Sequence, residues 1–259
     1  MGKLKNTIRA AIKDKPIEPT LRLLAMRLRN LKISRAEIID MIYNRQAFEI
    51  MELVLQDHSG CIDIGCHKGS FLREFVRLAP KGMHYAFEPI PSYSKLLKTQ
   101  FPSVEIVEAA VSDSSGDAKF YFMEENPALS SLRRLRFDWI KLTREPREII
   151  VKTVRLDDII PLKDKIDLLK IDAEGAEVLV IRGGLETIRR NRPLVFFEHA
   201  PSDAAEFGTN SEEIYDLLVN KCGLKISLLP DWLAKKPPFF KKQAFISATQ
   251  QDWCFIAHI

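Results

Sequence analysis

The fold is decided by residues 61–69, which read Cys-Ile-Asp-Ile-Gly-Cys-His-Lys-Gly. A short apolar run, residues 61–64, predicts a strand that enters a loop bounded by glycines, and the spacing predicts a helix over residues 71–78. Gly65 and Gly69 allow the backbone to turn tightly and to approach a ligand closely. In an α/β sheet such a loop lies at the carboxyl edge of the strands, where ligands bind.

Short apolar runs and helical segments alternate along the chain from residue 60 onward. This alternation is typical of an α/β fold whose mainly parallel sheet is covered by helices on both faces. The runs that predict strands are residues 61–64, 83–87, 104–107, 166–171, 194–197, 224–228 and 253–257. The segments that predict helices are residues 71–78, 92–100, 176–181 and 211–222.

The stretch from about residue 117 to residue 155 interrupts this alternation. Residues 118–123 and 149–155 predict extended strands on either side of a polar, basic stretch, so we expect a cap insertion over the site. The basic run Arg133-Arg134-Leu135-Arg136 lies beside two aromatic residues, Phe137 and Trp139. The pattern fits an anionic ligand, a sugar stacked on the indole, or a solvated insertion without a binding role.

Charge separates an N-terminal arm from the body of the chain. Residues 1–35 hold ten Lys and Arg against two acidic residues, a balance of +8, whereas the whole chain carries +4. The remaining residues therefore sum to −4. Helical apolar spacing and a capping box at residues 34–37 predict a basic helical arm over residues 1–57. We expect residues 58–259 to form the main domain.

Three interpretations of the arm stay open. It is a solvated helix that docks on the domain or on a second subunit of a homodimer, a weak contact for an anionic membrane surface, or an arm for nucleic acid. No aromatic residue precedes Tyr43, which weighs against base stacking. Nucleic acid is therefore not an expected partner.

Composition excludes several classes of protein. Hydrophobic residues make up 46% and charged residues 29%, which is typical of a globular chain and not of a disordered one. Because no run of 18 apolar residues and no signal peptide is found, we expect a cytoplasmic protein that does not span a membrane. The four cysteines form no CxxC pair and no zinc spacing, which predicts reduced thiols. The absence of a CxxxCxxC cluster excludes the usual iron–sulfur radical enzymes.

The residues around the glycine loop indicate which ligand it holds. The loop is not the G-x-G-x-x-G of dinucleotide sites, and the Asp63 carboxylate just before it would repel a pyrophosphate but suits an ammonium or sulfonium. Glu88, at the end of the second predicted strand, is placed to contact ribose hydroxyls. A ribose with a cationic tail describes S-adenosylmethionine better than NAD. The alternative is an ordinary strand–turn–helix with a surface acid.

Further titratable residues follow two later strands. Asp172 and Glu174 lie between an apolar strand and a helix, where they either orient and deprotonate an acceptor hydroxyl or merely cap the helix. Glu177 falls in the first turn of that helix, where an acid favours the macrodipole. His199, after Glu198, is a candidate general base or a structural hydrogen-bonder. Asp172, Glu198 and His199 are together an alternative set of ligands for a divalent metal, but no spacing demands one, so no metal site is predicted.

Six motifs follow one another over roughly residues 60–200. They are Asp63-x-Gly65-x-x-x-Gly69, Phe87-Glu88-Pro89, Ala110-Val111-Ser112-Asp113, Ser130-Ser131-Leu132, Val154-Arg155-Leu156-Asp157-Asp158 and Lys170-Ile171-Asp172-Ala173-Glu174-Gly175-Ala176-Glu177. Together they resemble the FkbM family of S-adenosylmethionine-dependent methyltransferases. The resemblance implies a Rossmann-like (class I) sheet of seven strands, the last antiparallel, and methylation of hydroxyl groups on sugars, glycolipids or secondary metabolites.

The resemblance also implies roles for individual residues. The methionine end of the donor would lie along the glycine loop, the ribose at Glu88, and the adenine against Ala110 and Val111. Asp172 would lie between donor and acceptor, and it is our first choice of base, with His199 and Glu174 behind it. The family usually has Ala-Asn where this chain has Cys66-His67. The full set of expected donor-binding residues is Asp63, Gly65, Cys66, His67, Gly69, Ser70, Phe87, Glu88, Pro89, Ala110, Val111 and Asp172.

Three rival functions remain beside methylation of a small-molecule or glycan hydroxyl. A methyltransferase acting on protein or RNA would need an open basic groove, whereas the body is acidic overall. A non-catalytic binding protein would commonly have lost one of the site residues. A nicotinamide oxidoreductase is disfavoured by the missing G-x-G-x-x-G motif.

Overall fold

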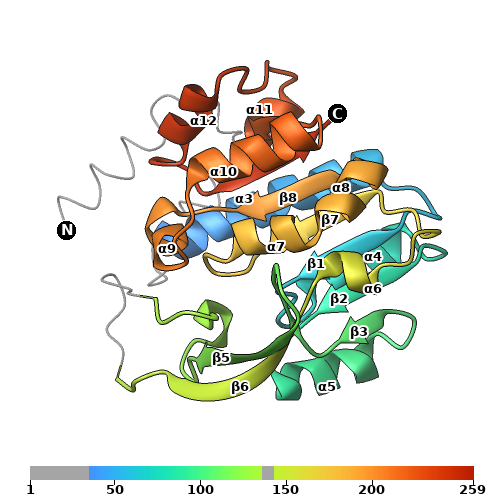
Figure 1. Ribbon diagram of the computed structural model, residues 1–259. Coiled ribbons are helices and arrows are strands. Elements are labelled where there is room, and N and C mark those ends of the chain that lie inside the picture. Colours follow the sequence, from blue (N-terminus) through green and yellow to red (C-terminus); the bar gives the residue numbers. More distant parts are fainter. Residues whose placement is uncertain (1–34, 136–142) are drawn as a thin grey trace, which may run out of the picture. The chain divides into compact units, whose positions relative to one another are not determined.

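The computed structural model describes residues 35–135 and 143–259 (Figure 1). The chain divides into two compact units, Met1–Arg45 and Gln46–Ile259. Helix α3 (Arg35–Val54) is present where the sequence predicts a helix. The rest of the basic arm lies outside the described residues, so its boundary at residue 57 and its partners stay predictions.

Seven strands form the main sheet, in the order β3-β2-β1-β7-β8-β10-β9. Neighbours from β3 to β8 pair in parallel, and β10 pairs antiparallel with both β8 and β9, which confirms the expected mixed, mainly parallel sheet. Each predicted strand is present within two residues of its expected start. The bounds are β1 Cys61–Ile64, β2 His84–Phe87, β3 Glu105–Val107, β7 Leu168–Ile171, β8 Leu194–Glu198, β9 Lys225–Leu228 and β10 Cys254–His258.

Helices cover both faces of this sheet. The strand order runs outward in opposite directions from β1 and from β7, so right-handed crossovers put the helices after β1 and those after β7 on opposite faces. Figure 1 shows α7 and α10 in front of the sheet. The helix bounds are α4 Ser70–Leu78, α5 Pro91–Gln100, α6 Leu156–Ile159, α7 Glu177–Gly183, α8 Leu185–Asn191, α9 Pro201–Glu206, α10 Ser211–Tyr215, α11 Leu229–Leu233 and α12 Lys242–Ala248.

The predicted helix over residues 211–222 has two parts. Only α10 winds as an α-helix, and residues Asp216–Lys221 continue it as a π-helix. Asn210 caps α10 by accepting a hydrogen bond from the backbone N–H of Glu213 at 3.1 Å. A short 3-10 helix at Pro127–Leu129 follows the fifth strand.

A second sheet stands apart from the main one. β5 (Gly116–Phe122) and β6 (Arg147–Val154) pair antiparallel where two extended strands are predicted, and β4 (Ala110–Val111), which we did not predict as a strand, pairs in parallel with β6. That this insertion caps the site stays a prediction. The residues Arg136, Phe137 and Trp139 lie outside the described part of the chain.

The core is built from strands that are buried on both faces. Val195, Phe196 and Phe197 of β8 are fully buried, as the continuous apolar run predicts for a central strand. An aromatic cluster around Phe245 of α12 packs against β8 and β10. Cys61, Cys66 and Cys222 are buried free thiols. Within the described ranges, the helices are all too short or too polar to cross a bilayer.

Candidate active site

The ends of β1 and β7 bring the two main motifs together. The two strands pair in parallel with Ile64 opposite Ile171, so the loops that follow them start side by side. The N–H of Asp172 donates to the Ile64 carbonyl at 3.2 Å. A Cβ at Gly65 would lie 1.8 Å from the Asp172 carbonyl oxygen, so only glycine permits this approach. The geometry therefore places the glycine loop directly beside Asp172.

The glycine loop is held in a compact turn. Gly65 and Gly69 have φ of 71° and 72°, and His67 between them is also left-handed at 47°. The Gly69 N–H donates to the Cys66 carbonyl at 2.7 Å, and a Cβ at Gly69 would approach the Phe101 ring to 2.7 Å. Burial, and then the neighbouring charge of Lys68, lower the pKa of His67. Among the described residues its Nε2 has no hydrogen-bond partner.

Glu88 connects the end of β2 to this loop. The side chain is buried, with 3% of the residue exposed, and Oε2 accepts from the His67 N–H at 2.9 Å. Oε1 accepts from the Ile90 N–H at 2.9 Å. Burial raises the pKa of Glu88 to about 7, against the opposing effect of the two backbone donors. Each oxygen keeps a lone pair free of these bonds, so the carboxylate can still accept from a diol.

The remaining expected donor-binding residues surround these groups to different degrees. The Phe87 carbonyl accepts from the N–H groups of Gly65 (3.1 Å) and Cys66 (3.5 Å). Ser70 starts α4 and is exposed, and Pro89 is half-buried. Ala110 packs in one apolar cluster with Ile90, two residues beyond Glu88, and Val111 is buried in the main core.

The buried side chain of Glu177 stabilises the turn after β7 through hydrogen bonds to its backbone. Its Oε1 accepts from the N–H groups of Ala173 (3.1 Å) and Gly175 (3.0 Å). Burial raises the pKa of Glu177 to about 7. Its contact with the turn, more than the macrodipole, explains an acid at this position. Helix α7 has no side-chain cap hydrogen bond, so Asp172 and Glu174 do not serve as its caps.

A hydrogen bond connects the insertion to the same turn. The Ser131 hydroxyl donates to the Glu174 carbonyl at 2.7 Å, and Glu174 takes a left-handed φ of 48°. Burial, followed by the charges of Asp172 and Glu198, raises the pKa of Glu174 well above its ordinary value. This environment disfavours the ionised carboxylate at Glu174, which favours Asp172 as the base.

Lys170 is the residue that sequence reasoning missed. It lies on β7 with 6% of its side chain exposed, and Nζ donates to the Gly65 carbonyl at 2.9 Å and to Asp172 Oδ2 at 3.0 Å. Nζ also lies 3.5 Å from Asp63 Oδ1. The sequence did contain a signal for this role, because a lysine inside an otherwise apolar strand must find buried acceptors.

His199 has a structural environment. It is 1% exposed, its Nε2 lies 2.8 Å from the Ser211 hydroxyl, and that hydroxyl lies 3.2 Å from Thr249 Oγ1. Burial lowers the pKa of His199 to about 4. An imidazole with these partners and this pKa is a weak base, so the placement favours the structural interpretation. Among the described residues no group of three His, Cys, Asp or Glu is arranged to hold a metal ion.

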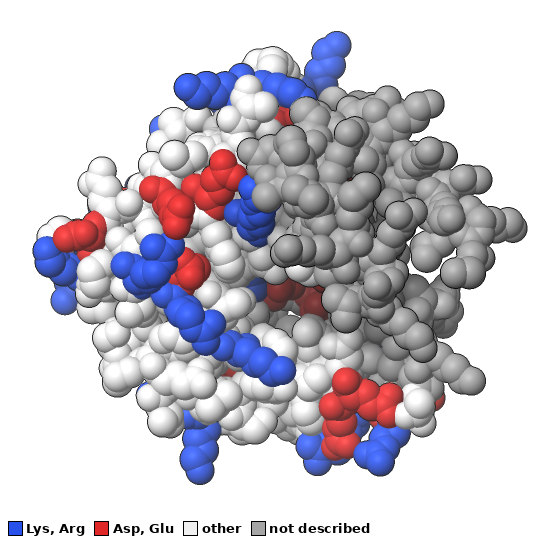
Figure 2. Space-filling model, turned by 180° about the vertical axis from the view of Figure 1, so that it is seen from behind, with Lys and Arg blue, Asp and Glu red and all other residues white. Residues whose placement is uncertain are grey.

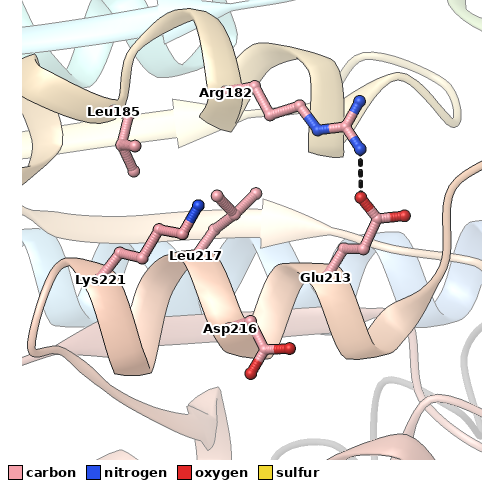
Figure 3. A pocket seen from close by; sticks show the side chains of 6 residues that line it. All are labelled: Arg182, Leu185, Glu213, Asp216, Leu217 and Lys221. Atoms are coloured by element: carbon pink, nitrogen blue, oxygen red, sulfur yellow. Dashed lines mark hydrogen bonds and ion pairs between the residues drawn. The ribbon is translucent and has the colours of Figure 1, made fainter.

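The surface outside this site carries mixed charge. On the described part of the face in Figure 2, Lys and Arg side chains stand next to Asp and Glu side chains. A pocket of about 330 Å³ lies between α7 and the helix formed by α10 and the π-helix (Figure 3). It contains none of the predicted site residues. Its lining residues are Arg182, Leu185, Glu213, Asp216, Leu217 and Lys221, of which Arg182 pairs with Glu213.

Comparison with known proteins agrees with this geometry. The Methyltransferase FkbM domain matches residues 63–226. The 2-O-methyltransferase NoeI of Sinorhizobium fredii (strain NBRC 101917 / NGR234) is 29% identical over 186 residues, which cover 66% of this chain and 75% of that protein. The crystal structure of methyltransferase FkbM from Methylobacillus flagellatus KT has a TM-score of 0.52 at 13% identity, covering 83% of this chain and 48% of that chain.

The crystal structure supports the class I methyltransferase fold, and this chain spans about half of its length. The domain match extends over more than half of the chain and includes the glycine loop, Glu88 and the turn after β7. The chain therefore belongs to the FkbM family of S-adenosylmethionine-dependent methyltransferases.

Proposed function

We propose that this protein transfers a methyl group from S-adenosylmethionine to a hydroxyl of a sugar, glycolipid or secondary metabolite. The observation that carries the proposal is the parallel pairing of β1 and β7, which sets Asp172 against the glycine loop. The naming of a relative as a 2-O-methyltransferase supports oxygen as the atom that accepts the methyl group.

The residues at the loop fit the donor that the family implies. Glu88 is fixed by two backbone donors and has acceptor capacity left for two ribose hydroxyls. His67 Nε2 is buried without a partner among the described residues, and it suits the carboxylate of the methionine moiety. The donor, when bound, supplies an electrophilic methyl on sulfur. We assign the adenine to the side of Ala110 and Val111.

Asp172 is the residue that we assign to the acceptor. Its side chain is 28% exposed, and Lys170 holds Oδ2, which fixes the carboxylate beside the loop. Oδ1 is the oxygen that we expect to accept the proton of the acceptor hydroxyl. Alignment of the two reactants supplies on the order of 7–11 kcal/mol, and proton removal contributes about 10²–10⁴-fold.

Thermal unfolding with S-adenosylhomocysteine tests the donor site first. At about 100 times its Kd a ligand stabilises the folded state by about 2.7 kcal/mol, which is a shift of roughly 5–10 °C for a chain of this size. We expect this shift for the wild type, a smaller one for Glu88→Ala, and none with NAD. No shift at saturating ligand would leave the glycine loop as a scaffold feature and would favour the non-catalytic rival.

Asp172→Asn then separates binding from chemistry. We expect S-adenosylhomocysteine affinity within a few-fold of wild type and turnover on an accepted sugar lowered by about 10²–10⁴-fold. Turnover within a few-fold of wild type would remove Asp172 from the role of base. Transfer of labelled methyl to RNA or protein, with none to sugars, would support the rival acceptors instead.

A further inference from the structure

The strongest feature outside the assigned roles is the environment of Lys170. Asp63 of β1 and Lys170 of β7 are register partners in the parallel pair. The Lys170 ammonium reaches the Gly65 carbonyl (2.9 Å), the Ile64 carbonyl (3.4 Å), Asp172 Oδ2 (3.0 Å) and Asp63 Oδ1 (3.5 Å). One buried cation therefore contacts the end of β1, the glycine loop and the end of β7.

All of these contacts are inside the protein. Asp63 is 1% exposed, and neither of its carboxylate oxygens has a hydrogen-bond partner among the described residues beyond the ion pair. The ammonium also lies 5.6 Å from the centre of the Phe71 ring. Burial opposes the charged lysine, but the carboxylates of Asp172 and Asp63 outweigh it and raise the pKa of Lys170. A lysine with its three protons so engaged has none left for a substrate.

We propose that Lys170 is a positioning residue that sets the glycine loop against Asp172, and that Asp63 acts on the donor through Lys170 without touching it. This inference rests on the proposed function. It differs from the expectation drawn from the sequence, in which the Asp63 carboxylate itself attracts the cationic end of the donor. In the structure the cation against Asp63 is already supplied by the chain.

The two accounts predict different couplings between Asp63 and Lys170. If Asp63 acts through Lys170, its removal matters only while Lys170 is present. If Asp63 contacts the donor, its removal lowers donor affinity by the same factor whether or not Lys170 is present. A double-mutant cycle separates these cases because the two residues are in contact and each variant removes one partner.

The experiment measures the Kd of S-adenosylhomocysteine by calorimetry for wild type, Asp63→Asn, Lys170→Met and the double variant. We expect Lys170→Met to weaken binding at least tenfold, and Asp63→Asn to add less than twofold in the Lys170→Met background. Multiplicative effects would overturn the proposal. Lys165→Met is the matched control, because Lys165 pairs with Asp167 at the surface, and we expect an unchanged Kd.

Lys170→Met leaves Asp63 buried without a partner, which can prevent folding. The double variant removes both charges, and in that event its Kd is compared with that of Asp63→Asn alone. Weaker binding in the double variant than in Asp63→Asn supports the positioning role of Lys170, and equal binding overturns it. Lys170→Arg keeps the charge, so we expect it to bind S-adenosylhomocysteine more tightly than the Lys170→Met or double variant. Substitution of a lysine with a merely structural role would change Tm and leave the Kd of the folded protein unchanged.

Wild-type behaviour distinguishes failure of this inference from failure of the proposed function. A wild type that does not bind S-adenosylhomocysteine overturns both. A wild type that binds it, with multiplicative effects in the cycle, overturns only the role of Lys170.

Discussion

Glu88 combines burial with two backbone hydrogen bonds, and its proposed contact with the donor makes binding dependent on pH. Its pKa is raised to about 7, whereas a ribose diol donates to the ionised carboxylate. Deprotonation must therefore accompany binding, and affinity must rise with pH through 7. We expect S-adenosylhomocysteine to bind about tenfold more tightly at pH 8 than at pH 6.

Calorimetry at pH 6, 7 and 8 in buffers of different ionisation enthalpy checks this dependence and counts the released proton. Glu88→Gln is the control, because an amide does not titrate, and its weaker binding is expected to be independent of pH. A wild-type affinity that stays flat across this range contradicts the assignment.

Glu177 makes a second prediction, on stability. Its pKa of about 7 in the folded protein lies above the ordinary value of 4.5, so the folded state binds its proton more tightly than the unfolded state. The stabilisation is complete below the unfolded pKa and is lost as pH rises towards 7. Relative to Glu177→Gln, the wild type should lose about 2–3 kcal/mol of unfolding free energy between pH 5 and pH 8.

Denaturant titrations of both proteins at the two pH values measure this difference. The glutamine variant keeps an oxygen for the Ala173 and Gly175 N–H groups, so those hydrogen bonds do not contribute to the change. Parallel pH profiles for the two proteins would show that Glu177 has an ordinary pKa.

At this scale the sequence predicted residue types better than their partners. Asp63, Glu88 and Asp172 could be singled out because each lies at or near the carboxyl end of a strand. Lys170 was not recognised as part of the site because its role depends on the register between β1 and β7, which pairs it with Asp63. His199 was a plausible base in sequence, and only the fold shows its contact with Ser211.

The stability of the glycine loop depends on close packing against β7 as well as on backbone conformation. A comparison of two glycines, Gly65 and Gly208, separates these two effects. Gly65 and Gly208 both have left-handed φ, at 71° and 67°. A Cβ at Gly65 would strike the Asp172 carbonyl, whereas at Gly208 it would meet nothing within 4 Å. We expect Gly208→Ala to cost about 1–2 kcal/mol, from φ alone. Gly65→Ala should cost more and abolish S-adenosylhomocysteine binding.

Chemical denaturation and calorimetry on both alanine variants measure these effects. Equal destabilisation of the two, with binding retained in both, would show that the approach of the loop to β7 is not needed.

The connection between the insertion and the turn after β7 is a second property of elements. Ser131 donates to the Glu174 carbonyl, while its neighbour Ser130 accepts from the Met123 N–H at 3.0 Å within the insertion. Each hydrogen bond is worth about 1 kcal/mol. Hydrogen exchange at residues 173–176 should therefore accelerate about fivefold in Ser131→Ala and stay unchanged in Ser130→Ala. Equal exchange in both variants would contradict this link.

Element prediction succeeded where apolar period and length agree. The strands of the main sheet and the β5–β6 pair are long enough for an apolar pattern to be visible in the sequence. β4 has only two residues and therefore no period, and the π-helix continues the apolar spacing of α10, so neither could be recognised.

For the whole molecule, the aromatic cluster around Phe245 and the glycine loop lie in different parts of the sheet. Phe245 is fully buried against the rings of Phe197 and Phe255, on the β10 side, whereas the donor loop follows β1. Phe245→Ala should lower the unfolding free energy by about 3–5 kcal/mol, and Phe240→Ala, at a 75% exposed position, by less than about 0.5 kcal/mol. Both should keep the wild-type Kd for S-adenosylhomocysteine, and a changed Kd in folded Phe245→Ala would show that the two regions are coupled.

The segment from β5 to β6 begins and ends at neighbouring positions, because Gly116 and Thr153 are register partners. A segment whose two ends meet can be exchanged between relatives, lengthened or shortened without moving any strand of the main sheet. If acceptor contacts reside there, a chimaera that carries the excursion of another family member should inherit that member's choice of substrate. It would keep the donor affinity of this chain. Exchange of the segment from β5 to β6 would therefore be a route to new methylation patterns.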